Sequence, residues 1–272
     1  MSSRLELKLS ACMLYVYSNL TGNAKASERG LEIIRECLRK EMAAPTSERN
    51  TAYCVFAGYV GTVLLHLSTE ELPDMKKYMS SLPQGLRIFA ASMISHALYL
   101  NGEYSRALGI CDAALFSCKE IYPVGMIYLY CVTAMCEISL KNPAEAEKAI
   151  LTAWKLAEKD ELIEPFIELH GLLQGLLESC IRKENPEMYR KISDAVITFS
   201  RGWMAVHNPA SDRPVTDALT TMEFSIAMLA CRDWSNREIA EHIGVSLNTV
   251  KHYLTDIFNK LHVKKRDELK NF

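Results

Sequence analysis

The chain lacks several features that define membrane proteins and enzymes. No run of about 18 apolar residues is free of charges or helix breakers, and the first ten residues mix acidic, basic and apolar side chains. We therefore expect a cytoplasmic protein that does not enter the membrane. A Gly-x-x-x-x-Gly-Lys-Ser/Thr phosphate loop is absent, as are recognisable Ser-His-Asp, Cys-His or paired-carboxylate arrangements. We expect neither enzymatic activity nor a bound cofactor.

Cysteine spacing gives no sign of a metal site. The chain has nine cysteines but no Cys-x-x-Cys pair, and none lies beside histidines at metal-ligand spacing. Most lie among apolar residues of predicted helices, so we favour buried free thiols. A redox-sensing role remains open for Cys111 and Cys118, which one helix would carry.

The composition is that of a globular protein large enough for two domains. The 272 residues are 49% hydrophobic, and the formal net charge is −2. From Asp217 onward basic and acidic side chains are equal in number, but beyond Asn248 six basic residues face three acidic ones. The charge distribution alone predicts only a small basic surface for nucleic acid, and therefore weak non-specific binding.

Residues 1–207 are predicted to be helical throughout. Apolar residues recur at helical intervals, most clearly between Leu86 and Leu100, and no strand-like alternation bounded by turns appears. Turn dipeptides such as Asn101-Gly102 separate the helices, and Asn142-Pro143 recurs as Asn185-Pro186 about 43 residues later. This spacing predicts stacked helical hairpins, about five in all.

The corner from Leu100 to Leu108 resembles the tetratricopeptide-type repeats that precede the DNA-binding domain of maltose-activator-like regulators. The resemblance implies a concave surface that receives a protein, a peptide or a small inducer. Several aromatic and histidine side chains could line that surface, although we favour ordinary core positions for all of them. They are Tyr53, Tyr59, His66, His96, Tyr99, Tyr128, Tyr130, Trp154 and His170.

Residues 235–261 predict two short helices joined by a tight turn. Ser235 and Glu238 have the spacing of a capping box, which begins the first helix. Gly244 stands where that helix needs a left-handed residue to end, and Ser246 then caps the second helix. Another capping box, at Thr220, begins a preceding helix that completes a three-helix core.

The second of these helices has one apolar and one polar face. Its apolar residues repeat at intervals of four, three and four, so they predict a single buried stripe. The stripe consists of Val250, Leu254, Ile257 and Leu261. The remaining positions carry side chains suited to phosphates and base edges. They are Asn248, Thr249, Lys251, His252 and Thr255.

The run from Leu219 to Leu269 resembles, without a gap, the LuxR-type (GerE-like) helix-turn-helix regulators of bacteria. The segments LTTME, SNREIAEHIGVS, TVKHYL and IFNKLHVKKRDEL stand in family order and spacing. The resemblance implies that Lys251, His252 and Thr255 enter the major groove. It places Thr249 and residues 235–237 on phosphates. The complete set of candidate DNA-binding residues is Ser235, Asn236, Arg237, Ser246, Asn248, Thr249, Lys251, His252, Thr255, Lys264 and Lys265.

The same resemblance implies a homodimer on two half-sites, with residues 267–272 in the two-fold contact. Asp233, Tyr253 and Thr255 depart from the usual family choices, so the preferred DNA sequence does not transfer. The expected partner is double-stranded promoter DNA, and RNA polymerase is a further possible partner. The implied function is a transcriptional regulator, an activator by family habit, whose repeat array senses a ligand or a protein.

We expect an all-α fold with three parts: a tetratricopeptide-like array at 1–207, a linker at 208–217 and the helix-turn-helix domain at 218–272. Two prolines and small polar residues indicate the linker. The alternative function is a protein-interaction scaffold that uses its helix-turn-helix for protein contacts. A sigma-factor region is a third possibility, but the closing IFNKLHV and the helical array do not fit it.

Overall fold

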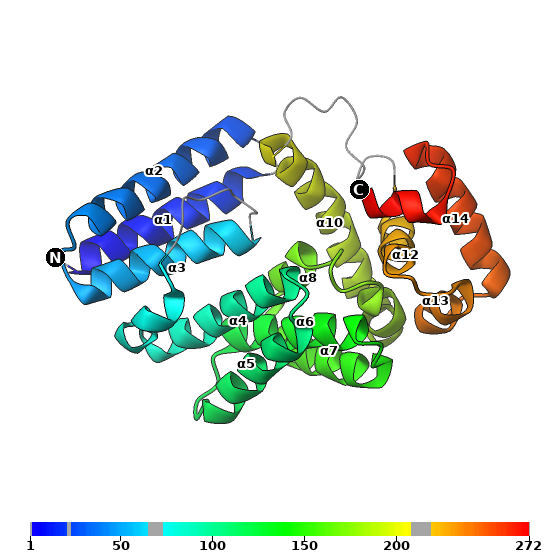
Figure 1. The fold of residues 1–272 in the computed structure, drawn as a ribbon, viewed down its shortest axis with the longest axis horizontal. Helices are drawn as coiled ribbons and strands as arrows, with labels where there is room; N and C mark the ends of the chain where they lie inside the picture. The colour runs from blue at the N-terminus through cyan, green and yellow to red at the C-terminus, as the bar shows by residue number, and fades with distance from the viewer. Residues whose placement is uncertain (1, 21–22, 65–72, 208–218, 272) are drawn as a thin grey trace. The chain divides into compact units, whose positions relative to one another are not determined.

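The computed structural model describes residues 2–20, 23–64, 73–207 and 219–271. Every regular element within these ranges is a helix (Figure 1), which confirms the predicted all-α fold class. None of the helices in the described ranges combines the length and apolarity needed to cross a bilayer. The predicted linker at 208–217 and the candidate residue His66 lie outside the described residues.

The chain divides into two compact units, and each is described by itself. The first comprises residues 1–129 and 202–209, and the second comprises residues 130–201 and 210–272. The second unit therefore joins part of the helical region to the helix-turn-helix. The division into 1–207, 208–217 and 218–272 stays a prediction.

The first unit is a succession of antiparallel helices. Each helix packs on the next one along the chain, α1 on α2, α2 on α3, α3 on α4 and α4 on α5, and α1 also packs on α3. This local pairing agrees with the expected helical hairpins. Gly102, with φ +77°, makes the turn between α4 and α5. The helices are α1 (Ser2–Leu20), α2 (Ala24–Ala43), α3 (Glu48–Leu64), the 3₁₀ helix η1 (Met75–Ser81), α4 (Gln84–Leu100), α5 (Tyr104–Ser117) and the start of α6 (Pro123–Ser139).

Most of the singled-out aromatic and cysteine side chains lie in the core. Tyr53, Tyr99, Tyr128 and Trp154 are buried, whereas Tyr59 and Tyr130 are half-buried. Burial raises the pKa of Cys54 to about 12 and that of Cys180 to about 11, so these thiols stay protonated at neutral pH. Cys111 is buried and Cys118 is half-buried, so their redox role stays a prediction.

The second unit contains one departure from regular helix. Residues 169–175 form consecutive turns, in which Gln174 and Gly175 have φ of +50° and +86°, and a short π-helix follows them. Such torsions interrupt an α-helix, and none of the turn signals in the sequence predicted a break at this point. The elements are the end of α6, α7 (Pro143–Ala157), η2 (Glu158–Asp160), α8 (Glu164–Glu168), the π-helix η3 (Leu177–Ile181), α9 (Arg182–Glu184), α10 (Pro186–His207) up to Arg201, α12 (Thr221–Cys231), α13 (Asn236–Ile243), α14 (Leu247–Leu261) and η4 (Arg266–Asn271).

Candidate nucleic-acid interface

Helix α13 begins and ends where the sequence predicts. The Ser235 hydroxyl accepts from the Glu238 backbone N–H at 3.2 Å, and the Glu238 carboxylate accepts from the Ser235 N–H at 2.6 Å. These hydrogen bonds lower the pKa of Glu238, which completes the capping box in its charged form. Gly244 ends the helix with φ +75°. Ile239 and Ile243 are fully buried, so the helix is anchored through its predicted apolar face.

Helix α12 begins with a second capping box, and the Glu223 carboxylate of this box also contacts α14. The Thr220 hydroxyl accepts from the Glu223 N–H at 3.3 Å, while Glu223 accepts from the Thr220 N–H at 2.7 Å. The Lys260 ammonium lies 2.7 Å from both Glu223 carboxylate oxygens. Burial alone would raise the pKa of Glu223, but the contacts with Lys260 and Thr220 outweigh it and lower the pKa.

Replacing Glu223 by Gln should lower the stability of the domain in a pH-dependent way. We expect a loss of about 1–2 kcal/mol at neutral pH, because a charge-assisted contact and a cap weaken together. A carboxyl with a lowered folded-state pKa stabilises above its unfolded pKa and stops stabilising as the pH falls through the folded value. Urea unfolding at neutral pH and at about pH 3 should show the difference between the two proteins shrinking in acid. A constant difference, or an equal effect of the exposed Glu241→Gln control, would contradict this role.

Helix α14 presents the two faces that the sequence predicts. Val250, Leu254, Ile257 and Leu261 are buried, and α14 packs on both α12 and α13. The Ser246 hydroxyl caps the helix by accepting from the Thr249 N–H at 3.1 Å. On the other side of α14 lie four exposed residues, Asn248, Lys251, His252 and Thr255. The buried stripe fixes the rotation of the helix, so these side chains stay on its solvent face.

The Lys251 ammonium is available to a ligand. Among the described residues no ion pair involves Lys251, and the Thr255 hydroxyl donates to the Lys251 carbonyl at 3.0 Å rather than to its side chain. His252 and Asn248 are likewise exposed. Lysine, histidine and asparagine side chains on one exposed helical face are suited to base edges in a major groove.

Several of the other predicted contact residues already form hydrogen bonds or ion pairs within the domain. The Ser246 and Thr249 hydroxyls lie 2.7 Å apart, and the Ser235 hydroxyl serves the α13 cap. Arg237 is exposed but pairs with Glu241 at 3.1 Å. Lys264 and Lys265 are exposed after the end of α14. Phosphate contacts at these positions stay a prediction.

One basic residue in the Lys264-Lys265-Arg266 run has a structural role that sequence reasoning missed. The Arg266 guanidinium donates to the Ala230 carbonyl at 3.2 Å, to the Trp234 carbonyl and to the Asn236 side-chain oxygen at 2.8 Å. It connects the C-terminal turn to the end of α12 and to the start of α13. Asn236, predicted to hold a phosphate, is therefore engaged by Arg266.

Replacing Gly244 by Val should destabilise the helix-turn-helix. Its φ of +75° is left-handed, and a β-branched side chain there costs about 1–2 kcal/mol. Thermal unfolding should show a lower Tm than the wild type. Gly109→Val in α5 is the control, because a Cβ there meets nothing within 4 Å. Equal melting of the Gly244 variant and the wild type would refute the need for that torsion.

The helix-turn-helix is also held by a polar contact surface that the sequence did not reveal. Residues 139–183, here the docking segment, meet α12, α13 and the turn between them. The Ser225 hydroxyl donates to Glu178 at 3.3 Å, and Arg232 donates to the Ser139 hydroxyl at 2.6 Å. The His242 ring nitrogen Nε2 lies 3.0 Å from the Gln174 carbonyl. These bonds join three positions of the domain to the docking segment.

Glu178 is the buried centre of this surface. Its side chain is 1% exposed and lies 3.0 Å from Nε2 of His170, which is 3% exposed. Burial alone would raise the pKa of Glu178, but the interaction with His170 and the Ser225 hydrogen bond outweigh it and lower the pKa. His170 is thus an interior histidine, as the sequence analysis favoured, with a specific partner.

Two glycines bring the docking segment close to the domain. A Cβ built on Gly171 would lie 2.3 Å from the Phe224 ring, and one built on Gly175 would lie 2.2 Å from Ile243 Cδ1. Only glycine fits such approaches. The solvent face of α14 takes no part in these contacts, so docking leaves Lys251 exposed.

Comparison with known proteins identifies the domain. Residues 217–271 match the family described as bacterial regulatory proteins, luxR family, and form a LuxR-type helix-turn-helix domain. A similar curated protein is the probable transcriptional regulatory protein SgaR of Hyphomicrobium methylovorum, with 28% identity over 94 residues. That similarity covers 31% of this chain and 40% of SgaR, so it spans less than half of either protein. Both matches are described as regulatory proteins. No solved structure matches the chain.

Proposed function

We propose that this protein is a transcriptional regulator that binds double-stranded promoter DNA through α14. The observation that carries the proposal is the exposed face of Asn248, Lys251, His252 and Thr255 on a helix whose opposite face is buried. The luxR-family match at residues 217–271 supports it. A rigid three-helix core holding one polar helix face outward is the arrangement that major-groove recognition requires.

The eleven predicted contact residues divide into two roles in this proposal. Lys251, His252, Thr255 and Asn248 contact base edges, because their side chains lie on the exposed face of α14. The others contact phosphates from the starts of α13 and α14 and from the exposed lysines after α14, where helix N–H groups and ammonium groups attract anions. They are Ser235, Asn236, Arg237, Ser246, Thr249, Lys264 and Lys265.

The proposal extends to the rest of the chain. The helical region serves as a tetratricopeptide-like sensor for a ligand or a protein, and two chains pair on two half-sites through residues 267–272. Activation, with contact to RNA polymerase, is the expected direction of regulation in the cytoplasm. Packing of successive helices in the first unit and the docking segment in the second supply the physical support for a sensor linked to the domain.

Fluorescence anisotropy of the full-length protein on random-sequence duplex DNA tests the proposal. We expect weak binding that falls with added salt, since phosphate contacts release counterions. The slope of the logarithm of the affinity against that of salt should be shallow, because few basic side chains lie near α14. A folded protein that shows no salt-dependent DNA binding would support the scaffold alternative instead.

A further inference from the structure

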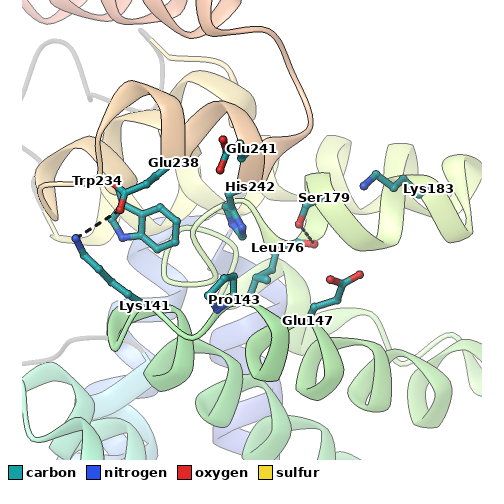
Figure 2. A pocket seen from close by; sticks show the side chains of 10 residues that line it. All are labelled: Lys141, Pro143, Glu147, Leu176, Ser179, Lys183, Trp234, Glu238, Glu241 and His242. Carbon is teal, nitrogen blue, oxygen red and sulfur yellow. Dashed lines mark hydrogen bonds and ion pairs between the residues drawn. The ribbon is translucent and has the colours of Figure 1, made fainter.

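A cavity of about 340 Å³ lies where the docking segment meets α13 (Figure 2). Its walls come from Lys141 and the start of α7, from residues 176–179 around the π-helix η3, from α9, and from Trp234 and α13. Leu176 and Trp234, which are 1% and 5% exposed, supply apolar surface. The volume lies at the lower end of the range of small-molecule sites, and most of the lining side chains are polar or charged, which suits a charged ligand.

The charges around the cavity leave one acid and one base unpaired. Lys141 lies 3.9 Å from Glu238, and Glu241 is paired with Arg237 outside the cavity. For the two remaining charged residues, Glu147 and Lys183, no ion pair occurs within the described ranges. They belong to different helices, α7 and α9, and do not pair with each other (Figure 2). A ligand that carries both signs of charge fits this arrangement.

His242 adds a hydrogen-bond acceptor beside these two charges. Burial lowers its pKa, so the ring is neutral at physiological pH. Its Nε2 lies 3.0 Å from the Gln174 carbonyl oxygen, which can only accept, so the proton belongs on Nε2. Nδ1 is then left as an acceptor for a donor such as an ammonium group.

We propose that this cavity binds a small zwitterion of the α-amino-acid type. The Glu147 carboxylate receives the ligand ammonium, the Lys183 ammonium receives the ligand carboxylate, and the apolar side chain lies against Leu176 and Trp234. The inference rests on the proposed function and deepens it, because it names the ligand class of the sensor.

The position of the cavity gives this ligand a route to the DNA-binding domain. Glu147 and Lys183 belong to the docking segment, whereas Trp234 and His242 belong to the helix-turn-helix domain. A zwitterion held by both sets of residues binds more tightly when the helix-turn-helix domain is in contact with the docking segment than when the two are separated. Its binding therefore shifts the equilibrium toward the state in which they are in contact. Hydrogen exchange of α13 is therefore expected to slow when the ligand binds.

Isothermal titration of the full-length protein with each of the common free L-amino acids tests the site. We expect at least one with an apolar side chain to bind. Its methyl ester, which lacks the carboxylate charge, and its N-acetyl form, which lacks the ammonium, should bind about tenfold or more weakly. Glu147→Gln and Lys183→Met should cause similar losses, because each removes one exposed charge. Glu184→Gln and Lys155→Met are the matched controls and should bind as the wild type does.

The inference is overturned if no free amino acid binds at millimolar concentration. It is also overturned if the affinity is unchanged in both the Glu147 and Lys183 variants and is the same for the methyl ester and the N-acetyl form as for the free amino acid. DNA binding of the same samples separates this result from the proposed function. A protein that binds DNA but no amino acid overturns the zwitterion site alone. A protein that binds an amino acid through Glu147 and Lys183 but never binds DNA supports the site and overturns the regulator.

Discussion

Lys251→Ala is expected to reduce affinity for the preferred DNA site by about 1–3 kcal/mol, or roughly fivefold to more than a hundredfold. Lys251 is the exposed cation on the polar face of α14, and the described residues hold it in no ion pair. If it reads a base, its removal should relax the choice of base at one position of the site. Binding of the variant to the preferred duplex and to single-base changes measures both effects.

The control for this experiment is Asn259→Ala, which changes an exposed residue near the far end of the same helix. It should bind like the wild type. If Lys251→Ala weakens binding equally on all sequences, Lys251 contacts a phosphate instead of a base. Unchanged affinity of a folded Lys251 variant would contradict its place in the interface.

Gly175→Val is expected to release the helix-turn-helix domain from the docking segment and to cost about 3 kcal/mol. Its φ of +86° disfavours any side chain with a Cβ. That Cβ would also lie 2.2 Å from Ile243 Cδ1, and Ile243 is fully buried, so it has little room to move. Urea unfolding gives the loss of stability.

Hydrogen exchange distinguishes release of the domain from unfolding of the whole protein. On release, residues 169–178 and α13 should exchange faster than the wild type, while α4 and α5 should be unchanged. Gly109→Val serves as the control, since its Cβ would meet nothing within 4 Å. Wild-type stability and exchange in the Gly175 variant would show that the close approach does not hold the domain.

The helices of the helix-turn-helix could be predicted almost completely, because the residues that begin, end and orient each helix lie close together in the sequence. Capping boxes at Thr220 and Ser235, the left-handed Gly244 and the stripe from Val250 to Leu261 each depend on spacings of a few residues. The structure confirms these features. The exposed polar face of α14 follows from the same periodicity.

The docking segment could not be predicted, because its contacts join residues far apart in the chain. Glu178 and Ser225 are 47 positions apart, and Arg232 reaches back 93 positions to Ser139. Spacing along the chain contains no information about such pairs. Arg266 was missed for a related reason: in a basic run it resembles a phosphate contact, and only its carbonyl partners reveal a structural role.

The irregular stretch at 169–175 was missed as well. Gln174 adopts a left-handed torsion that its residue type does not signal, and Gly171 and Gly175 resemble ordinary weak positions in a helix. Their role, which is to allow the close approach of Phe224 and Ile243, can be seen only in the folded structure. A partial signal was present, since two glycines within five residues are uncommon in a helix interior.

Selection from random duplex DNA, with the full-length protein and the fragment 216–272 at one salt concentration, measures whether α14 recognises a DNA sequence. We expect one two-fold symmetric sequence to be enriched and Lys251→Ala to lose the enrichment. A site enriched by the fragment alone would mean that the helical region restrains the domain. Enrichment of no sequence by either folded protein would contradict DNA recognition through α14.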